Sequence, residues 1–270
     1  MSDWNARSDA ARLPSSFTDF LRTERPDLLP SPIGGVGVPI EATTILALRF
    51  REGVLMAGDR RATAGMAIAQ SDIEKVFPTD SHSAVAISGA PGPAIEIVRL
   101  FQTELEYYEK VEGEVLSLAG KANHLSRLIR GNFPAALQGL IVVPLFGGYD
   151  SRAGDGRIYS YDVTGGAYKE TDYYATGSGG QHAKNTLKRL WTRAEDIDAD
   201  AALRMAVEAL ADAAEEDAAT AGPDLVHRIY PTVYSITGDG VNEIAGGDVE
   251  TVSRTVMEAR GARAGDRGPS

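Results

Sequence analysis

The sequence of 270 residues contains no cysteine, and its four histidines are scattered at His82, His124, His182 and His227. The first absence excludes disulfides, thiolate metal sites and a cysteine nucleophile. The second leaves no paired ligand spacing, so we expect no metal site and no histidine-based triad. No apolar run approaches the roughly 20 residues that span a bilayer. The first residues also lack a basic segment followed by an apolar one, so we expect neither a secretory signal nor a membrane anchor.

Basic residues are in the minority, with 27 lysines and arginines against 38 acidic residues and a formal net charge of −11. This balance argues against nucleic acid as a partner, because binding to phosphates requires a basic surface. The hydrophobic content of 43% and the charged content of 24% are ordinary for a globular protein with a sizeable core.

The texture of the chain changes abruptly at residue 43. Residues 15–30 could form one short amphipathic helix, and residues 31–42 are rich in glycine and proline, which breaks regular structure. From Thr43 onward the sequence is rich in β-branched and apolar residues, and Arg51-Glu52-Gly53 has the composition of a hairpin turn. We therefore interpret residues 1–42 as a propeptide or tail and the rest as the folded domain.

Periodicity within the folded domain predicts an α+β protein. The predicted strands lie at residues 43–50, 53–60, 66–77, 83–90, 137–150, 156–170 and 229–244. Apolar stripes at helical spacing predict helices around residues 97–108, 118–131, 181–191 and 203–214. Antiparallel hairpins that alternate with pairs of helices predict a four-layer αββα sandwich, in which helices flank two stacked antiparallel sheets.

A threonine at the start of a strand is ordinary by itself, but Thr43 has unusual company. A hydroxyl nucleophile needs a base, and without a suitable histidine the base would be the α-amino group of a chain that starts at this residue. Thr43 follows the glycine- and proline-rich segment directly, and Thr44 is the adjacent alternative. Asp59 and Lys75 belong to neighbouring predicted strands. We expect them to meet the threonine at one end of the sheet, where a buried lysine would lower the pKa of the hydroxyl.

Five elements of the sequence together resemble the proteasome β subunits, which are N-terminal nucleophile hydrolases. They are Thr43-Thr44-Ile45, the run Gly58-Asp59-Arg60-Arg61-Ala62-Thr63 with Lys75, Ser88-Gly89, Gly177-Ser178-Gly179 and Asp217-Ala218-Ala219-Thr220. The resemblance extends from Thr43 to about Glu258. The stretches Ser15–Leu21 and Ala219–Leu225 resemble, more narrowly, the actinobacterial proteasome β subunit.

The resemblance implies a threonine endopeptidase that degrades unfolded proteins inside a barrel, without a cofactor or metal. Its catalytic residues would be Thr43 as nucleophile, Asp59 and Lys75 as its activating pair, Gly89 as oxyanion donor, and Ser178, Asp217 and Thr220 as supports of the amine. Thr63 and Pro91 would flank the substrate strand. The primary specificity pocket would be lined by Ala62, Ile73, Ile87 and Pro91, and these small or apolar residues favour a chymotrypsin-like preference.

The resemblance also implies processing and assembly. Residues 1–42 would be a propeptide removed by autocleavage between Ala42 and Thr43, residues 43–260 the catalytic domain and residues 261–270 a flexible tail. Seven-membered β rings would stack between heptamers of α subunits in the cytoplasm. A ring-shaped AAA ATPase would deliver Pup-tagged proteins to them. Two departures, Glu41-Ala42 before the cleavage point and Ala221 in place of a usual glycine, bear on processing and on the local backbone.

Three alternatives remain at this point. One is a simpler N-terminal nucleophile enzyme, either an HslV-type protease or an amidohydrolase, although HslV-like chains lack such a long N-terminal extension. The second is a non-enzymatic shell subunit similar to a proteasome α subunit, which would lack the threonine, aspartate and lysine set. The third is a binding sandwich without catalysis.

Overall fold

The computed structural model describes residues 43–64, 67–70 and 72–265, with side chains for residues 43–61 and 72–262. The chain divides into two compact units, Met1–Val36 and Gly37–Ser270, and the described residues all belong to the second. The predicted propeptide, including Ala42, lies outside the described residues.

One antiparallel sheet has the strand order β10-β1-β2-β11-β12. Its strands are β1 (Thr44–Phe50), β2 (Gly53–Gly58), β10 (Tyr173–Gly177), β11 (Thr232–Thr237) and β12 (Gly240–Glu243). The predicted hairpin at Arg51 and Glu52 is confirmed, since β1 and β2 pair from Phe50↔Gly53 to Ile45↔Gly58. The short strand β10, which the sequence did not predict, pairs with the other side of β1.

A second antiparallel sheet has the order β5-β6-β7-β8-β9, and β3 pairs with β4 in a separate ribbon. The strands are β3 (Ala62–Ala64), β4 (Ala67–Gln70), β5 (Val76–Asp80), β6 (Ser83–Gly89), β7 (Val142–Asp150), β8 (Asp155–Tyr161) and β9 (Ala167–Glu170). The predicted strand over residues 66–77 is therefore wrong as a single element. The exposed Asp72 and Glu74 interrupt it, and the Ile73 amide instead donates to the Arg60 carbonyl at 3.0 Å.

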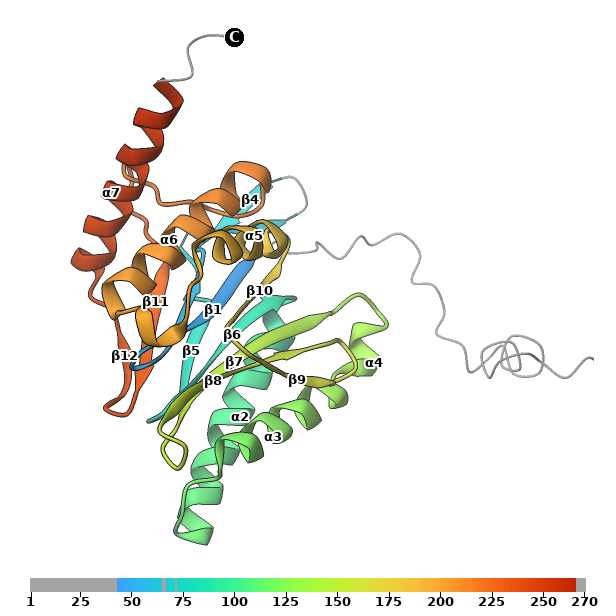
Figure 1. Ribbon diagram of the computed structural model, residues 1–270. Coiled ribbons are helices and arrows are strands. Elements are labelled where there is room, and N and C mark those ends of the chain that lie inside the picture. Colours follow the sequence, from blue (N-terminus) through green and yellow to red (C-terminus); the bar gives the residue numbers. More distant parts are fainter. Residues whose placement is uncertain (1–42, 65–66, 71, 266–270) are drawn as a thin grey trace, which may run out of the picture. The chain divides into compact units, whose positions relative to one another are not determined.

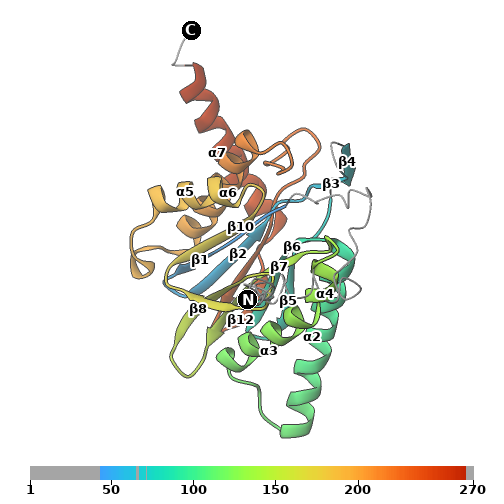
Figure 2. The same cartoon turned by 90° about the vertical axis from the view of Figure 1, so that its right-hand side faces the viewer.

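Helices cover the outer face of each sheet, as Figures 1 and 2 show from two directions. On the second sheet lie α2 (Pro91–Glu112) and α3 (Leu118–Gly131), followed by the short α4 (Phe133–Ala136). On the first sheet lie α5 (Gly180–Leu190) and α6 (Ala199–Glu216), joined through the turn η2 (Ala194–Asp196). This arrangement confirms the predicted four-layer sandwich. Within the described part of the chain, none of the helices combines the length and apolar character that a bilayer-spanning segment needs.

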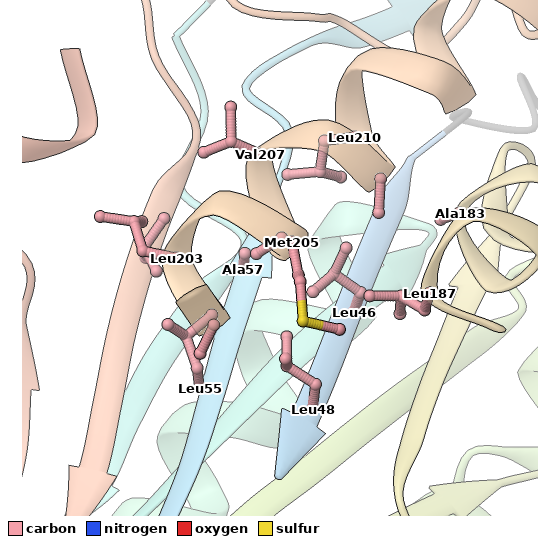
Figure 3. Close-up of a cluster of buried hydrophobic side chains, with 14 of the residues drawn as sticks. Leu46, Leu48, Leu55, Ala57, Ala183, Leu187, Leu203, Met205, Val207 and Leu210 are labelled. Carbon is pink, nitrogen blue, oxygen red and sulfur yellow. The ribbon is translucent and has the colours of Figure 1, made fainter. Parts of the chain in front are cut away.

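The alternation of side chains along β1 divides the core into separate layers. Ile45 and Ala47 point into the layer between the two sheets, together with Val54 and Met56 of β2. The opposite face of β1 and β2 meets α5 and α6, and Figure 3 shows Leu46 and Leu48 among the side chains of these helices. Both leucines are fully buried, and burial of each contributes about 1.5–3 kcal/mol. This packing fixes which face of the sheet each residue near the start of β1 occupies.

The helix α7 (Gly246–Gly265) follows β12 and was not predicted from the sequence. It includes residues 261–265, so the predicted flexible tail was placed to begin too early, and residues 266–270 lie outside the described residues. Val249 and Val256 join the core beside α6. Arg260 forms ion pairs with Asp212 and Glu215 of α6. These contacts explain why this polar segment is helical.

Candidate active site

The ends of four strands meet at one end of the sandwich. Thr43 precedes β1, Asp59 follows β2, Lys75 precedes β5, and Gly89 ends β6. The Ile87 amide donates to the Lys75 carbonyl at 2.9 Å, which ties the segment before β5 to the end of β6. The topology thereby brings the predicted threonine, aspartate, lysine and glycine to one place.

Asp59 is the centre of a buried hydrogen-bond network. Its side chain is 0% exposed, and its Oδ1 accepts the Lys75 ammonium at 2.7 Å and the Thr44 amide at 2.8 Å. Its Oδ2 accepts the backbone amides of Arg61 and Ala221, each at 3.0 Å. A buried carboxylate is tolerated when its lone pairs are filled by donors and an opposite charge. Four donors meet this condition here, so Asp59 holds the lysine in one position.

Lys75, the partner of Asp59, is also buried. Its side chain is 5% exposed, and its Nζ donates to Asp59 Oδ1 and to the Arg61 carbonyl at 2.5 Å. Lys75 can be a functional lysine only if its side chain is at least partly buried, and in the structure it is buried. Gly58 lets the backbone of β2 lie close to Lys75, because a Cβ at residue 58 would be only 3.1 Å from Lys75 Cβ.

Thr43 and Lys75 border a cavity of about 370 Å³. The predicted pocket residues Ile73, Ile87 and Pro91 are among its walls, and Gly89 is at its edge. The remaining lining residues were not singled out from the sequence; they are Asp72, Glu74, Phe77 and Ile95. For Ala62 and Thr63 the structure describes only the backbone, which lies in β3.

Gly89 has a backbone conformation that favours glycine. Its φ is +105°, and a Cβ there would lie 2.1 Å from the Ile141 carbonyl oxygen, which belongs to rigid backbone. The chain turns directly from Gly89 into α2, where Pro91 occupies the first turn. A glycine is therefore needed to bring this strand end to the edge of the cavity.

A second polar cluster lies beside the first, on the turns after β10 and α6. Asp217 Oδ2 accepts the hydroxyls of Ser178 at 2.5 Å and Thr220 at 2.6 Å. The Ser178 amide in turn donates to the Thr43 carbonyl at 2.9 Å. The structure therefore brings together the three residues predicted to support the amine, and links them to residue 43.

Asp217 is an ionised acceptor at neutral pH. Burial raises the pKa of its carboxyl, but hydrogen bonds from Ser178, Thr220 and the Ala219 amide, with the nearby His182, outweigh burial. The pKa of Asp217 therefore lies below its usual value. Both hydroxyls must then donate to it, which fixes the direction of these hydrogen bonds.

The two adjacent threonines have different surroundings. Thr43 lines the cavity, whereas the side chain of Thr44 is fully buried and hydrogen-bonded to Thr220 on the side of α5 and α6. Thr44 was the alternative nucleophile, but its side chain is enclosed and does not line the cavity. Of the two threonines, Thr43 is therefore the one that lines the cavity.

Arg61 was missed as a site residue, although it stands in the recognised run after Asp59. Its backbone amide and carbonyl contact Asp59 and Lys75. Its guanidinium donates to the carbonyls of Ala218 at 3.0 Å and Thr220 at 3.3 Å. It thus joins the two polar clusters. Among the described residues, no three histidine, aspartate or glutamate side chains gather as a metal site would require.

Comparison with known proteins places these features in a family. The family model described as "Proteasome subunit" matches residues 40–226. The chain is 52% identical over 260 residues to the proteasome subunit beta of Acidothermus cellulolyticus, covering 93% of this chain and 89% of that protein. It is 50% identical over 255 residues to the proteasome subunit beta of Stackebrandtia nassauensis, covering 91% of each. With the observed sandwich, these matches show that the chain belongs to the proteasome subunit family.

Proposed function

We propose that this chain is the catalytic β subunit of a 20S proteasome core, and that its Thr43 hydroxyl is the nucleophile of a threonine endopeptidase. One observation carries the proposal. Thr43 borders a 370 Å³ cavity together with Lys75 and Gly89, and the lysine is held there by the buried Asp59. The identity of about half of all residues with two β subunits supports the same function.

The base in this mechanism is the α-amino group of Thr43, which is free only in a chain that begins at this residue. Its ordinary pKa of about 8 makes it able to accept a proton at neutral pH. The Thr43 hydroxyl transfers its proton to this amine through a water molecule, while the positive charge of Lys75 lowers the pKa of the hydroxyl. Ser178, Asp217 and Thr220 hold the amine and the water in position.

The acyl transfer follows from these positions. The Thr43 oxygen bonds to the carbonyl carbon of the scissile peptide, and the Gly89 amide stabilises the resulting oxyanion, a contribution of a few kcal/mol in related sites. The carbon–nitrogen bond then breaks, and the departing amine takes the proton from the α-ammonium group. Water attacks the ester, releases the carboxylate product and restores the hydroxyl.

The same chemistry explains a precursor. While residue 43 is acylated by Ala42 it has no free amine, and the full-length chain is inactive. The Thr43 oxygen bonds to the Ala42 carbonyl carbon, and the carbon–nitrogen bond between the two residues breaks, which gives an ester and the free α-amine. Water then hydrolyses the ester and releases residues 1–42 with a terminal carboxylate. Residues 43–260 then form the catalytic domain. Cleavage only after assembly would keep the protease enclosed.

The cavity supports a preference for apolar side chains. Ile73, Phe77, Ile87 and Ile95 contribute apolar surface to it, and Ala62 would complete the wall. Thr63 and Pro91 would flank the substrate strand. Cleavage of model peptides should be fastest after large apolar residues. Cleavage only after arginine or aspartate would contradict this apolar preference.

Family membership supports an assembly in which rings of seven β subunits stack between rings of α subunits in the cytoplasm. A ring-shaped AAA ATPase would deliver Pup-tagged proteins to this particle. Native mass spectrometry of the chain co-expressed with its α subunit tests the first point. Degradation of a Pup-tagged protein by the particle, with and without the ATPase, tests the second.

The decisive experiment is intact-mass analysis of assembled particles after treatment with an epoxyketone. We expect a mature chain that begins at Thr43 and carries a single adduct. Thr43→Ala should remain full length without an adduct, whereas Thr43→Ser should be processed and labelled. A stable, unlabelled full-length wild-type chain in assembled rings would instead identify a non-enzymatic shell subunit.

A further inference from the structure

The alternation of β1 puts Thr43 and Thr44 on opposite faces of the sheet. Thr43 shares the parity of Ile45, which faces the second sheet, and Thr44 shares that of Leu46, which faces α5 and α6. Thr44 Oγ1 accepts the Gly179 amide at 3.1 Å and lies 2.7 Å from Thr220 Oγ1. The hydroxyl that does not face the cavity is thus bonded to the turns that support the site.

The direction of each hydrogen bond in this group can be assigned. The Gly179 amide can only donate, so Thr44 Oγ1 accepts from it. Thr220 uses its one hydroxyl proton toward Asp217, so in the bond between the two threonines Thr44 is the donor. The chain therefore runs from the Gly179 amide through Thr44 and Thr220 to the carboxylate of Asp217, which also accepts Ser178.

The backbone of Thr44 belongs to the other polar cluster. Its amide donates to Asp59 Oδ1 at 2.8 Å, and its carbonyl accepts the Asp59 amide at 3.0 Å. Asp59 in turn holds Lys75. One residue, directly after the nucleophile, therefore binds the aspartate–lysine pair through its backbone and the Ser178–Asp217–Thr220 group through its side chain.

The packing leaves this link little freedom. A Cβ on Gly179 would lie 2.5 Å from Thr44 Oγ1 and 2.7 Å from Thr220 Oγ1, so a side chain in the turn would push both hydroxyls aside. Thr44 and Thr220 are 0% and 1% exposed. Buried hydrogen-bond chains of this kind are stiff when every member is satisfied and costly when one member is removed.

We propose that Thr44 is a positioning residue for the reaction at Thr43, because its hydroxyl holds Asp217 and Ser178 in register with the nucleophile. The inference rests on the proposed function. Serine at residue 44 would keep both hydrogen bonds. Valine has nearly the same shape but would leave the Gly179 amide without its acceptor and Thr220 without its donor. The substrate-binding walls contain neither Thr44 nor Thr220.

The test compares Thr44→Val with Thr44→Ser in assembled particles of the full chain. A small misplacement of supporting groups can cost up to about 100-fold, so we expect Thr44→Val to lower kcat by about 10- to 100-fold, with KM within about twofold. Thr44→Ser should keep kcat near the wild-type value. The split between kcat and KM, together with the retained kcat of the serine variant, distinguishes positioning of the catalytic groups from a loss of substrate binding.

Thr186→Val is the matched control. Thr186 is also a buried threonine, and its hydroxyl donates to Asp212 between α5 and α6. We expect it to lower the melting temperature without changing kcat. Should Thr44→Val not assemble, Thr44→Cys replaces the hydroxyl by a thiol, a weaker donor and acceptor, and we expect an intermediate loss of kcat.

The outcomes separate the two proposals. Activity at the wild-type level in Thr43→Ala would refute the proposed function itself. An inactive Thr43→Ala beside a Thr44→Val of normal kcat would overturn only the role of Thr44. An equal loss of kcat in Thr44→Val and Thr186→Val would likewise reduce Thr44 to a structural residue.

Discussion

In the described part of the chain, two ion pairs between a buried lysine and an aspartate lie at opposite ends of the second sheet. At the end where β5 begins, Lys75 Nζ lies 2.7 Å from Asp59 Oδ1 as a hydrogen-bonded ion pair. At the end where β5 finishes, Lys121 of α3 lies 2.6 Å from Asp80 Oδ2, with side-chain exposures of 4% and 15%. This second contact lacks hydrogen-bond geometry, since Asp80 Oδ2 makes no hydrogen bond.

Both pairs adjoin a cavity. The cavity beside Lys121 has a volume of about 290 Å³ and is lined by turns that carry Ser81 and Ser117. Both hydroxyls are engaged in local hydrogen bonds. Ser117 caps α3 by accepting the Gly120 amide, and Ser81 is hydrogen-bonded to the ring of His82. At the other end the cavity is bordered by Thr43 and by the left-handed Gly89. A buried lysine paired with an aspartate is thus no evidence of catalysis by itself. The neighbouring groups decide what the pair can do.

Removal of each lysine should give the largest contrast. Lys75→Met should lower peptidase activity by about 10²- to 10⁴-fold, the range that activation of a nucleophile supplies, and should leave residues 1–42 attached. Lys121→Met should keep activity per assembled particle within about twofold. Peptide hydrolysis and intact mass measure both effects. Equal losses of activity in the two variants would remove the functional distinction between the ends.

Neutralising each aspartate compares how much the two ion pairs contribute to the free energy of unfolding. Asp59→Asn leaves a buried ammonium without its counter-ion, and breaking such a pair costs about 3–5 kcal/mol. Asp80→Asn should cost less, because Asp80 is partly exposed and its contact with Lys121 lacks hydrogen-bond geometry. Chemical denaturation of the two variants measures the difference. A larger loss in Asp80→Asn would show that the far pair contributes more to folding than its geometry suggests.

A pair of glycine substitutions compares the backbone at the two ends. Gly89→Ala should lose about 1–3 kcal/mol from its φ of +105° alone, and further from the clash with the Ile141 carbonyl. In Gly148→Ala the nearest atom is Leu118 Cδ1 at 2.3 Å, the end of a flexible side chain that can move. Thermal unfolding should therefore rank Gly89→Ala as the more damaging change; the reverse order would contradict this.

The smallest effect concerns Asp217. Its folded-state pKa lies below the ordinary value of 3.8, so its ionised form stabilises the fold at neutral pH, and this contribution is lost as the pH falls below about 3.8. Ser178→Ala removes one donor, so the pKa of Asp217 should rise toward its ordinary value, and the loss of stability below about pH 3.8 should be smaller. Melting temperatures from about pH 6 to about pH 3 measure this. Ser81→Ala, at the other end, should leave the curve unchanged.

Much of the fold follows from periodicity. The hairpin of β1 and β2 and the helices α2, α3, α5 and α6 were predictable because one face of each is apolar at the appropriate spacing. The helix α7 was missed because its buried stripe is thin, with the fully buried Ser253 between Val249 and Val256, and because much of its attachment comes from Arg260. Ion pairs with distant residues leave no periodic signal in a sequence.

Phe77 and Ile95 show where prediction of the site stops. Both have the residue types of ordinary core positions on β5 and α2, yet they line the cavity beside Thr43. Only the packing of the helix on the strand ends decides that they face this space. Ile73 and Ile87 could be named beforehand through the family resemblance, and not through any local pattern.

The sequence by itself determined the composition-level exclusions, the alternation of strands and helices, and the presence of a threonine pair near an aspartate and a lysine. It favoured Thr43 as the nucleophile but left Thr44 as the adjacent alternative, because neighbouring residues of one type carry nearly the same local information. The tertiary structure separated them, since a strand packed between two layers must point successive side chains to opposite faces. One threonine therefore reaches the cavity, and the other joins the hydrogen bonds behind it.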